Sequence, residues 1–211
     1  MSKILVMGHK NPDTDSICSA IAYANLKKEL GFEVEAVRLG TISKETQFIL
    51  DYLSIDAPRL IEGVNEGDKI ILVDHNEEGQ SVNNRDAATI LEIVDHHKID
   101  LSTNAPLNIR MEAICSTASV LFKMYKEAWF EISKEIWTMI LAWILSDSLL
   151  FKSATTTKED VLIAEELKKI TWIEDLEKFA MPMFDAKSDL GDMPAEDIVK
   201  YDYKEFLLYL Y

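Results

Sequence analysis

The sequence predicts an α/β fold with three layers, in which a mostly parallel sheet lies between two layers of helices. Two observations predict this α/β/α class. Short apolar runs alternate with helical patterns in the first half of the chain, and helical patterns dominate the rest. Strands that alternate with helices need crossover connections, which make neighbouring strands parallel and cover both faces of the sheet. The 211 residues suffice for one large domain.

Apolar runs of strand length give the order of the elements. Strands are predicted at residues 4–7, 34–39, 59–61, 69–73 and 89–94. Helices are predicted at residues 15–30, 43–53, 116–125, 133–146, 158–170 and 173–184. Thr14 or a neighbouring aspartate is expected to cap the first helix, and Gly31 to end it.

A polar stretch at residues 188–194 contains glycine and proline and has the composition of a linker. Residues 1–187 are therefore predicted to form the folded domain. The residues that follow the linker are too few for a second domain of their own.

The composition argues against several classes of function. The formal net charge of −15 argues against nucleic-acid and membrane-surface binding, since both need clustered lysine and arginine. We find no secretory signal peptide and no apolar run of the roughly 18 residues that a membrane span needs. Cys18 and Cys115 lie in apolar surroundings, which predicts two buried thiols and a reducing, cytoplasmic location.

Each of the four histidines follows a predicted strand and stands beside an aspartate. His9 follows the first strand and precedes Asp13 and Asp15, whereas His75 follows Asp74 at the end of strand 69–73. His96 and His97 follow Asp95 at the end of strand 89–94. Because the carboxyl ends of parallel strands share one edge, we expect these side chains to gather on a single rim.

So many carboxylates in one place are costly without a cation. Aspartate combined with imidazole suits manganese, cobalt, iron or zinc better than calcium. Two such ions would clamp a phosphoryl group and activate a water, and the N-terminus of helix 15–30 would favour phosphate. Taken singly, Asp74 is explained as a helix cap and His75 as a structural residue. The combination on one rim favours a metal site.

Asp147 lies in an apolar helical stretch, where a buried charge needs a partner. A metal ion would supply that partner. The alternative is an ion pair with a nearby lysine such as Lys152.

Four ordered motifs resemble those of the DHH phosphoesterases, and most closely those of the manganese-dependent, family II inorganic pyrophosphatases. They are residues 8–16 (GHKNPDTDS), 73–76 (VDHN), 95–97 (DHH) and 146–153 (SDSLLFKS). The resemblance implies a Rossmann-like DHH domain that binds two Mn²⁺ ions, with Co²⁺ or Mg²⁺ as substitutes. It implies hydrolysis of pyrophosphate to two phosphates.

The resemblance also implies a role for each motif residue. His9 and Asp13 would hold one metal ion, Asp15, His96 and Asp147 the other, and Asp74 both. His97 would contact the substrate and protonate the leaving phosphate, so that His97 and Asp74 are the catalytic pair. Lys204 would bind substrate.

Family members are longer than this chain and carry a C-terminal domain that closes over the metals. Residues 188–211 are therefore expected to be a linker and the truncated start of that substrate-closing domain. Catalysis is expected to be impaired without the closing domain, because it excludes water and neutralises phosphate charge. Another DHH phosphoesterase activity, on oligonucleotides, cyclic dinucleotides or polyphosphate, is an alternative.

The second half of the chain is unusually rich in aromatic and methionine residues. They are explained either by core packing or by an apolar interface, which would make the chain a binding module, a homodimer or the target of an engineered partner. The residues concerned are Trp129, Phe130, Trp137, Trp143, Trp172, Met181, Met183 and Phe184.

Overall fold

The computed structural model describes residues 3–103, 105–130, 132–189 and 191. Within these residues, six strands form one sheet in the order β3-β2-β1-β4-β5-β6, and all neighbouring strands are parallel. The strands are β1 (Ile4–Met7), β2 (Val34–Arg38), β3 (Arg59–Leu60), β4 (Lys69–Val73), β5 (Thr89–Asp95) and β6 (Asn108–Met111). The predicted parallel α/β sheet is confirmed.

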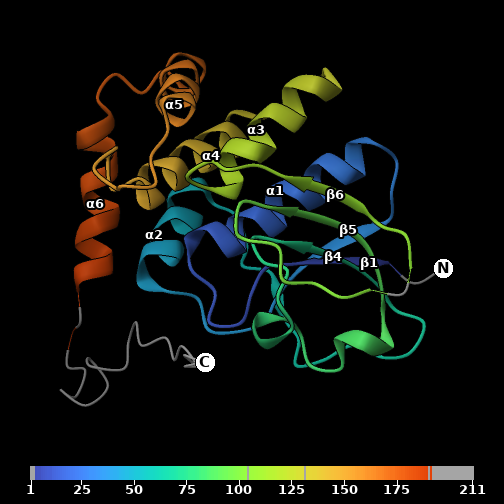
Figure 1. Ribbon diagram of the computed structural model, residues 1–211. Helices are drawn as coiled ribbons and strands as arrows, with labels where there is room; N and C mark the ends of the chain where they lie inside the picture. Colours follow the sequence, from blue (N-terminus) through green and yellow to red (C-terminus); the bar gives the residue numbers. More distant parts are fainter. Residues whose placement is uncertain (1–2, 104, 131, 190, 192–211) are drawn as a thin grey trace, which may run out of the picture.

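Helices pack over the sheet and over one another (Figure 1). They are α1 (Thr14–Glu29), α2 (Lys44–Leu53), α3 (Thr117–Ala128), α4 (Lys134–Asp147), α5 (Lys158–Thr171) and α6 (Leu176–Ser188). Two short 3-10 helices, η1 (Glu78–Gln80) and η2 (Arg85–Ala87), connect β4 to β5. The side chain of Asp13 caps α1, as expected for a neighbouring aspartate.

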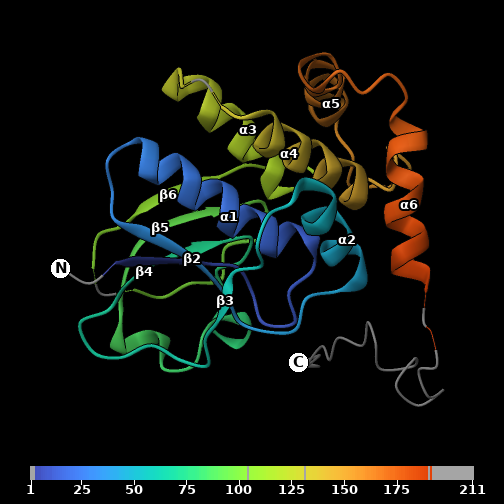
Figure 2. The ribbon, with the colours of Figure 1, turned by 180° about the vertical axis from the view of Figure 1, so that it is seen from behind.

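The two faces of the sheet are covered differently (Figures 1 and 2). The described α-helices all contribute to one apolar cluster, whereas the cluster on the other face is built from strands and connecting loops. Right-handed crossovers explain the division, because the chain moves outward in opposite directions from β1 to β2 and from β4 to β5. The observed fold therefore has α-helices on one face, and η1, η2 and loops where a second helical layer was expected.

β6 is the strand that the sequence did not predict. It is short, it lies at the sheet edge, and its sequence (NIRM) has polar residues at alternate positions. Such a segment carries a weak apolar signal, since only one neighbour and one face pack against it. At the other end of the chain, α6 continues to Ser188, four residues past its predicted end at 184, so Ser188 is helical and not part of the predicted linker.

The aromatic residues divide between core and surface. Trp137 and Trp143 on α4 are buried, and so is Met183. Trp129 and Trp172, each the residue that ends a helix, are 92% and 81% exposed. Core packing is thus confirmed for the buried residues, and the predicted interface is reduced to the exposed ones.

Self-association through Trp129 and Trp172 stays a prediction. Serine at both positions is expected to shift a homodimer to the mass of a monomer, since aromatic side chains dominate interface energetics. Light scattering of the wild type and of the double variant measures this mass. An unchanged dimer mass in the variant would contradict this interface.

Among the described helices, none combines the length and the apolar character that a membrane span requires.

Candidate metal centre

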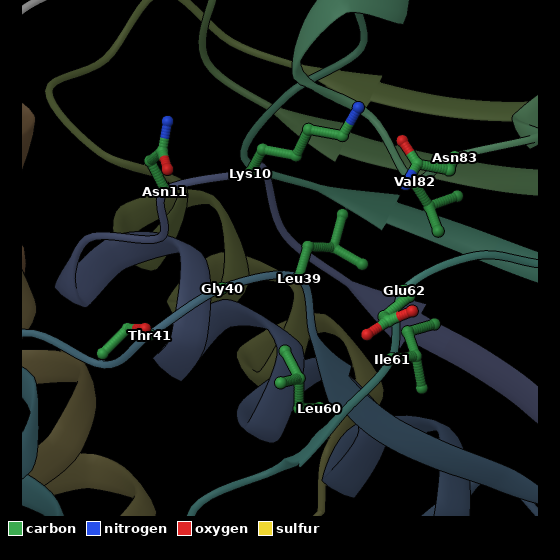
Figure 3. A pocket seen from close by; sticks show the side chains of 10 residues that line it. All are labelled: Lys10, Asn11, Leu39, Gly40, Thr41, Leu60, Ile61, Glu62, Val82 and Asn83. Carbon is green, nitrogen blue, oxygen red and sulfur yellow. The ribbon is translucent and has the colours of Figure 1, made fainter.

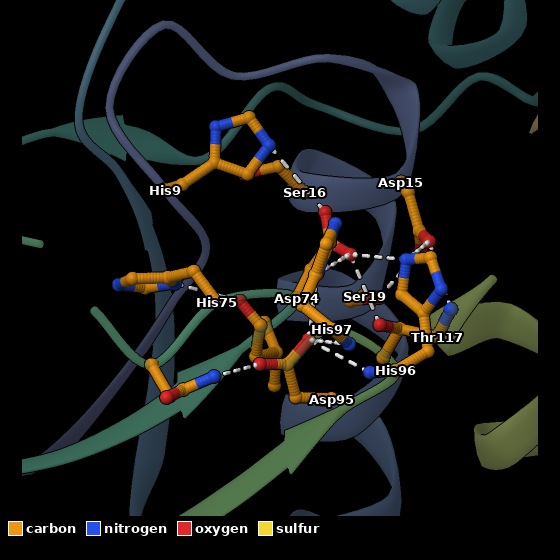
Figure 4. A network of polar contacts seen from close by, with 12 residues as sticks. His9, Asp15, Ser16, Ser19, Asp74, His75, Asp95, His96, His97 and Thr117 are labelled. Atoms are coloured by element: carbon orange, nitrogen blue, oxygen red, sulfur yellow. Dashed lines mark hydrogen bonds and ion pairs between the residues drawn. The ribbon is translucent and has the colours of Figure 1, made fainter. Parts of the chain in front are cut away.

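The predicted site residues meet at the carboxyl ends of β1, β4 and β5 (Figure 4). The loop after β1 and the start of α1 approach from one side, and the last residue of α4, Asp147, completes the group. The single rim expected from the sequence is confirmed by the ion pairs that join these elements.

Gly8 allows the loop after β1 to pass directly over the start of α1. A Cβ atom at this position would lie 2.0 Å from Ser16 Oγ and 2.6 Å from the Ser16 carbonyl oxygen. Any side chain would therefore push β1 and α1 apart. The absence of a side chain at Gly8 brings His9 close to the first turn of α1.

His9 presents one ring nitrogen to two carboxylates. Its Nδ1 lies 2.7 Å from the Lys10 carbonyl oxygen, and a carbonyl can only accept, so Nδ1 carries the proton. Its Nε2 then lies 3.4 Å from Asp13 Oδ2 and 3.5 Å from Asp74 Oδ2. Asp13 uses its other oxygen to cap α1 through the Ser16 backbone N–H, so Asp13 is both a helix cap and a candidate ligand.

Asp74 is the central carboxylate of the group. It is buried directly after β4, with a φ angle of 58°, a conformation uncommon for residues other than glycine, asparagine and aspartate. Thr117 Oγ1 donates to its Oδ1 over 3.0 Å, and His96 Nε2 lies 3.4 Å from the same oxygen. Burial disfavours its charge, but His9 and His96 outweigh burial and hold the pKa of Asp74 well below its usual range. Asp74 is therefore not a helix cap, and its two oxygens face two different histidines.

Asp15, His96 and Asp147 form the other half of the group. His96 Nδ1 donates to the Ile114 carbonyl oxygen, which leaves Nε2 facing Asp15 Oδ2 at 3.8 Å. Burial, and then the charge of Asp74, raise the pKa of Asp15 to about 7. Burial, and then the charges of Asp15 and Asp13, raise the pKa of Asp147 well above its usual range. The neighbours that set the pKa of Asp147 are thus carboxylates rather than Lys152.

These residues fit a pair of cations. Burial lowers the pKa of His9, yet the adjacent Asp13 and Asp74 raise it to about 11. Burial likewise lowers the pKa of His96, yet Asp74 and Asp15 raise it to about 9. The carboxylates thus favour a positive charge at the Nε2 atoms of both His9 and His96. Ligand atoms on one ion lie roughly 3–4 Å apart, because metal–ligand bonds are about 2.0–2.2 Å long, and the nitrogen–oxygen distances match this.

Asp95 of the DHH triplet is used inside the protein. Its Oδ1 accepts from the backbone N–H groups of His96 and His97 and from His97 Nδ1, the last over 2.8 Å. Its Oδ2 accepts from Asn76 Nδ2 over 2.7 Å. Asp95 is fully buried, and both of its oxygens accept hydrogen bonds from within the protein. It thereby orients His97.

His97 and His75 differ from the two histidines that face carboxylates through Nε2. His97 Nδ1 lies 3.9 Å from Asp74 Oδ1, but this nitrogen already bonds Asp95, and the half-exposed ring keeps Nε2 for other partners. His75 is buried, with Nδ1 on the Val73 carbonyl oxygen and Nε2 on Ser81 Oγ. Figure 4 shows its ring directed away from His96. The structural explanation of His75 is confirmed.

Sequence reasoning missed the residues that hold the aspartates in place. The Thr117 backbone N–H donates to Asp15 over 2.8 Å, and its hydroxyl donates to Asp74. Ser19 Oγ donates to Asp15 Oδ1, and Asn76 links Asp95 to the Lys98 carbonyl oxygen. Thr117 begins α3, where a threonine is explained equally well as a helix start. Only Asn76, which belongs to the motif at residues 73–76, had a signal in the sequence.

A separate cavity of about 400 Å³ lies beside the loop after β1 (Figure 3). It opens between that loop, the ends of β2 and β3, and residues 82–83. None of the candidate metal ligands lines it. Its walls are Lys10, Asn11, Leu39, Gly40, Thr41, Leu60, Ile61, Glu62, Val82 and Asn83.

Comparisons with known proteins agree with the geometry. The model of the "DHH family, N-terminal domain" matches residues 3–144. Proteins of Bacillus cytotoxicus and Bacillus cereus are 52% and 51% identical over 208 residues, which is 98% of this chain and 67% of each relative. Both relatives carry the name "probable manganese-dependent inorganic pyrophosphatase".

Solved structures give the same result. A Methanococcus jannaschii protein assigned to the family II inorganic pyrophosphatases superposes with a TM-score of 0.87 at 37% identity, over 96% of this chain and 67% of that one. An exopolyphosphatase-related protein of Bacteroides fragilis, 17% identical with a TM-score of 0.63 over 94% of this chain and 60% of that one, shares the fold. The chain belongs to the DHH family, in the group of the manganese-dependent inorganic pyrophosphatases.

Proposed function

We propose that this chain hydrolyses inorganic pyrophosphate to two phosphates with two Mn²⁺ ions. The observation that carries the proposal is the position of Asp74, whose Oδ2 faces His9 Nε2 and whose Oδ1 faces His96 Nε2. A carboxylate that offers one oxygen to each of two histidines is suited to bridging two ions. The high identity to proteins named manganese-dependent inorganic pyrophosphatases supports this substrate and this metal.

The proposed ligands divide into two sets around Asp74. His9 and Asp13 belong to one ion, since both lie beside Asp74 Oδ2. Asp15, His96 and Asp147 belong to the other ion, beside Asp74 Oδ1. In both histidines Nδ1 donates to a backbone carbonyl, which fixes the ring and leaves Nε2 as the ligand atom. Co²⁺ and Mg²⁺ are the expected substitutes.

Bound manganese would supply Lewis-acid stabilisation of the phosphoryl oxygens and a more acidic water. The remaining chemistry is assigned to the chain itself. His97 is half-exposed, and the Asp95 carboxylate both orients its ring and raises its pKa, although burial opposes this. A protonated His97 at this position would contact pyrophosphate and donate a proton to the leaving phosphate.

The chain spans about two thirds of the length of the relatives that it matches. The division into a catalytic domain at residues 1–187 and a linker with the start of a substrate-closing domain at 188–211 stays a proposal. Lys204, the expected substrate-binding lysine, lies outside the described residues. A cytoplasmic location also stays a proposal, which the two buried free thiols suit.

A phosphate-release assay tests the proposed function. With Mn²⁺, this chain is expected to release phosphate from pyrophosphate, and chelation is expected to abolish the release. Polyphosphate, a cyclic dinucleotide and a short oligonucleotide are measured in parallel at equal concentration. Faster turnover of one of these than of pyrophosphate would contradict the proposed substrate. Phosphate release that persists after chelation would contradict the metal requirement.

A further inference from the structure

A buried carboxylate, Glu45 in the first turn of α2, lies behind the candidate metal centre. Its side chain is 3% exposed, although glutamate is rarely buried without partners. Ser146 Oγ donates to its Oε1 over 2.7 Å, and Thr14 Oγ1 donates to its Oε2 over 3.2 Å. Lys187 of α6 places its ammonium 3.3 Å from the same Oε2. Residues of three helices, α1, α4 and α6, therefore contact one carboxylate that belongs to a fourth helix, α2.

The two hydroxyl donors occupy informative positions. Thr14 lies between Asp13 and Asp15 at the start of α1, and Ser146 immediately precedes Asp147 at the end of α4. Three of the proposed metal ligands are thus adjacent in sequence to a residue that Glu45 holds. Thr46, the next residue of α2, adds a second link through its hydroxyl, 3.0 Å from Thr14 Oγ1.

Repulsion between two carboxylates acts to push the start of α1 and the end of α4 apart. Asp15 and Asp147 bring two carboxylates together in a buried place, where two negative charges repel each other. A connection from behind opposes this repulsion, because it fixes both backbone segments while leaving the aspartate oxygens free. Replacing Glu45 by an apolar residue would leave the Ser146 hydroxyl without its acceptor and would break the link between α4 and α1.

Glu45 acts on the proposed ligands through its hydrogen bonds to Thr14 and Ser146, because Lys187 pairs with its charge. Residues that orient ligands from behind in this way typically alter metal affinity by about 10- to 100-fold when they are replaced.

We propose that Glu45 is a positioning residue for the metal centre: it ties the start of α1 to the end of α4 and so holds Asp15 and Asp147 at the separation that a shared Mn²⁺ ion requires. The inference rests on the proposed function, because it takes Asp15 and Asp147 as ligands of one ion. No role in contacting substrate is assigned to Glu45.

Glu92 offers a matched control for the substitution Glu45→Gln. Like Glu45, Glu92 on β5 pairs with one lysine, Lys27, over 2.7 Å, and it accepts from one hydroxyl, that of Tyr23, where Glu45 accepts from two. Its partners lie in the second half of α1, away from the first turn that carries Asp15. Glu92→Gln thus removes a comparable ion pair from the fold without touching the start of α1 or the end of α4.

Calorimetric Mn²⁺ titration of metal-free protein, together with thermal unfolding of the same samples, tests the proposal. Glu45→Gln is expected to weaken one of the two Mn²⁺ sites about 10- to 100-fold and to leave the other within about threefold of wild type. Glu92→Gln is expected to lower the unfolding temperature and to keep both Mn²⁺ affinities. Ser146→Ala, which removes one donor without burying an unpaired charge, is expected to weaken the same site as Glu45→Gln.

The outcomes separate the inference from the proposed function. Wild-type Mn²⁺ affinities in both Glu45→Gln and Ser146→Ala overturn the inference alone. An equal loss of affinity in Glu92→Gln also overturns it, because general destabilisation then explains the effect. A wild-type chain that binds no Mn²⁺ overturns the proposed function and this inference with it. If Glu45→Gln does not fold, the Mn²⁺ affinities of Ser146→Ala alone test the inference.

Discussion

Replacing Asp74 with asparagine is expected to lower Mn²⁺-dependent phosphate release from pyrophosphate by about 10³-fold or more. Asparagine keeps one oxygen and loses the charge, so it cannot serve two ions, and the loss of several kcal/mol of transition-state stabilisation corresponds to this factor. The fold should survive the change. Asparagine tolerates the positive φ of 58° at this position, and its amide still fills the site. Steady-state phosphate release at saturating Mn²⁺ measures the effect.

Asp68 at the opposite end of β4 provides the control for Asp74→Asn. Its carboxylate accepts from the Asn65 backbone N–H in a turn and faces no histidine. Asp68→Asn is expected to keep activity within about twofold of wild type. An Asp74→Asn protein that folds and retains more than about a tenth of wild-type activity would contradict the bridging role of Asp74.

Replacing His97 with glutamine is expected to lower kcat by about 10²–10⁴-fold, the usual contribution of a general acid. The number of bound Mn²⁺ ions should stay at two, because His97 Nδ1 is engaged by Asp95 and the proposed ligands are elsewhere. This outcome separates two arrangements, since Asp74, His96 and His97 also form a compact three-residue group that could hold an ion. Rapid-mix phosphate release and Mn²⁺ titration of the same variant measure both quantities.

Two results would contradict the assignment of His97. An unchanged kcat would exclude proton donation by its ring, and the loss of one Mn²⁺ ion would make His97 a ligand. Asp95→Asn serves as the companion variant, because it leaves the ring in place but weakens its orientation. It is expected to lower kcat by less than His97→Gln does.

Most of the candidate site could be predicted because its residues follow strands. A parallel sheet places strand ends on one edge regardless of loop detail, so His9, Asp74 and His96 were brought together by topology alone. Which side chains face the centre could not be predicted in the same way. Asp95 and His75 stand in the motifs beside the candidate metal ligands. In the folded chain both form hydrogen bonds within the protein and have a structural role.

The supporting residues were invisible for a related reason. Thr117 and Glu45 each lie far in sequence from the aspartates that they support or stand behind, and local rules explain both as ordinary members of a first helical turn. Exposure was equally hard to predict. Trp143 and Trp172 have similar apolar character, but one lies in the middle of a buried helix and the other ends a helix at the surface.

Helices were expected on both faces of the sheet, but the α-helices cover one face. The number of helices in a sequence does not determine which face of the sheet each of them covers. The connection from β4 to β5 contains no long apolar period, and its helical parts are the short η1 and η2. The handedness of crossovers then assigns this connection to the face opposite α1. The parallel sheet followed from the alternation of the elements, whereas the layer on each face depended on the strand order, which a single sequence does not give.

The number of Mn²⁺ ions bound per chain tests the two-metal centre most directly. Metal-free protein is titrated with Mn²⁺, and the stoichiometry is confirmed by elemental analysis after removal of unbound metal. Two ions per chain are expected for the wild type, and no more than one for Asp147→Asn, since Asp147 belongs to the set of one ion only. One ion or none in the wild type, or two tightly bound ions in Asp147→Asn, would contradict the proposed centre.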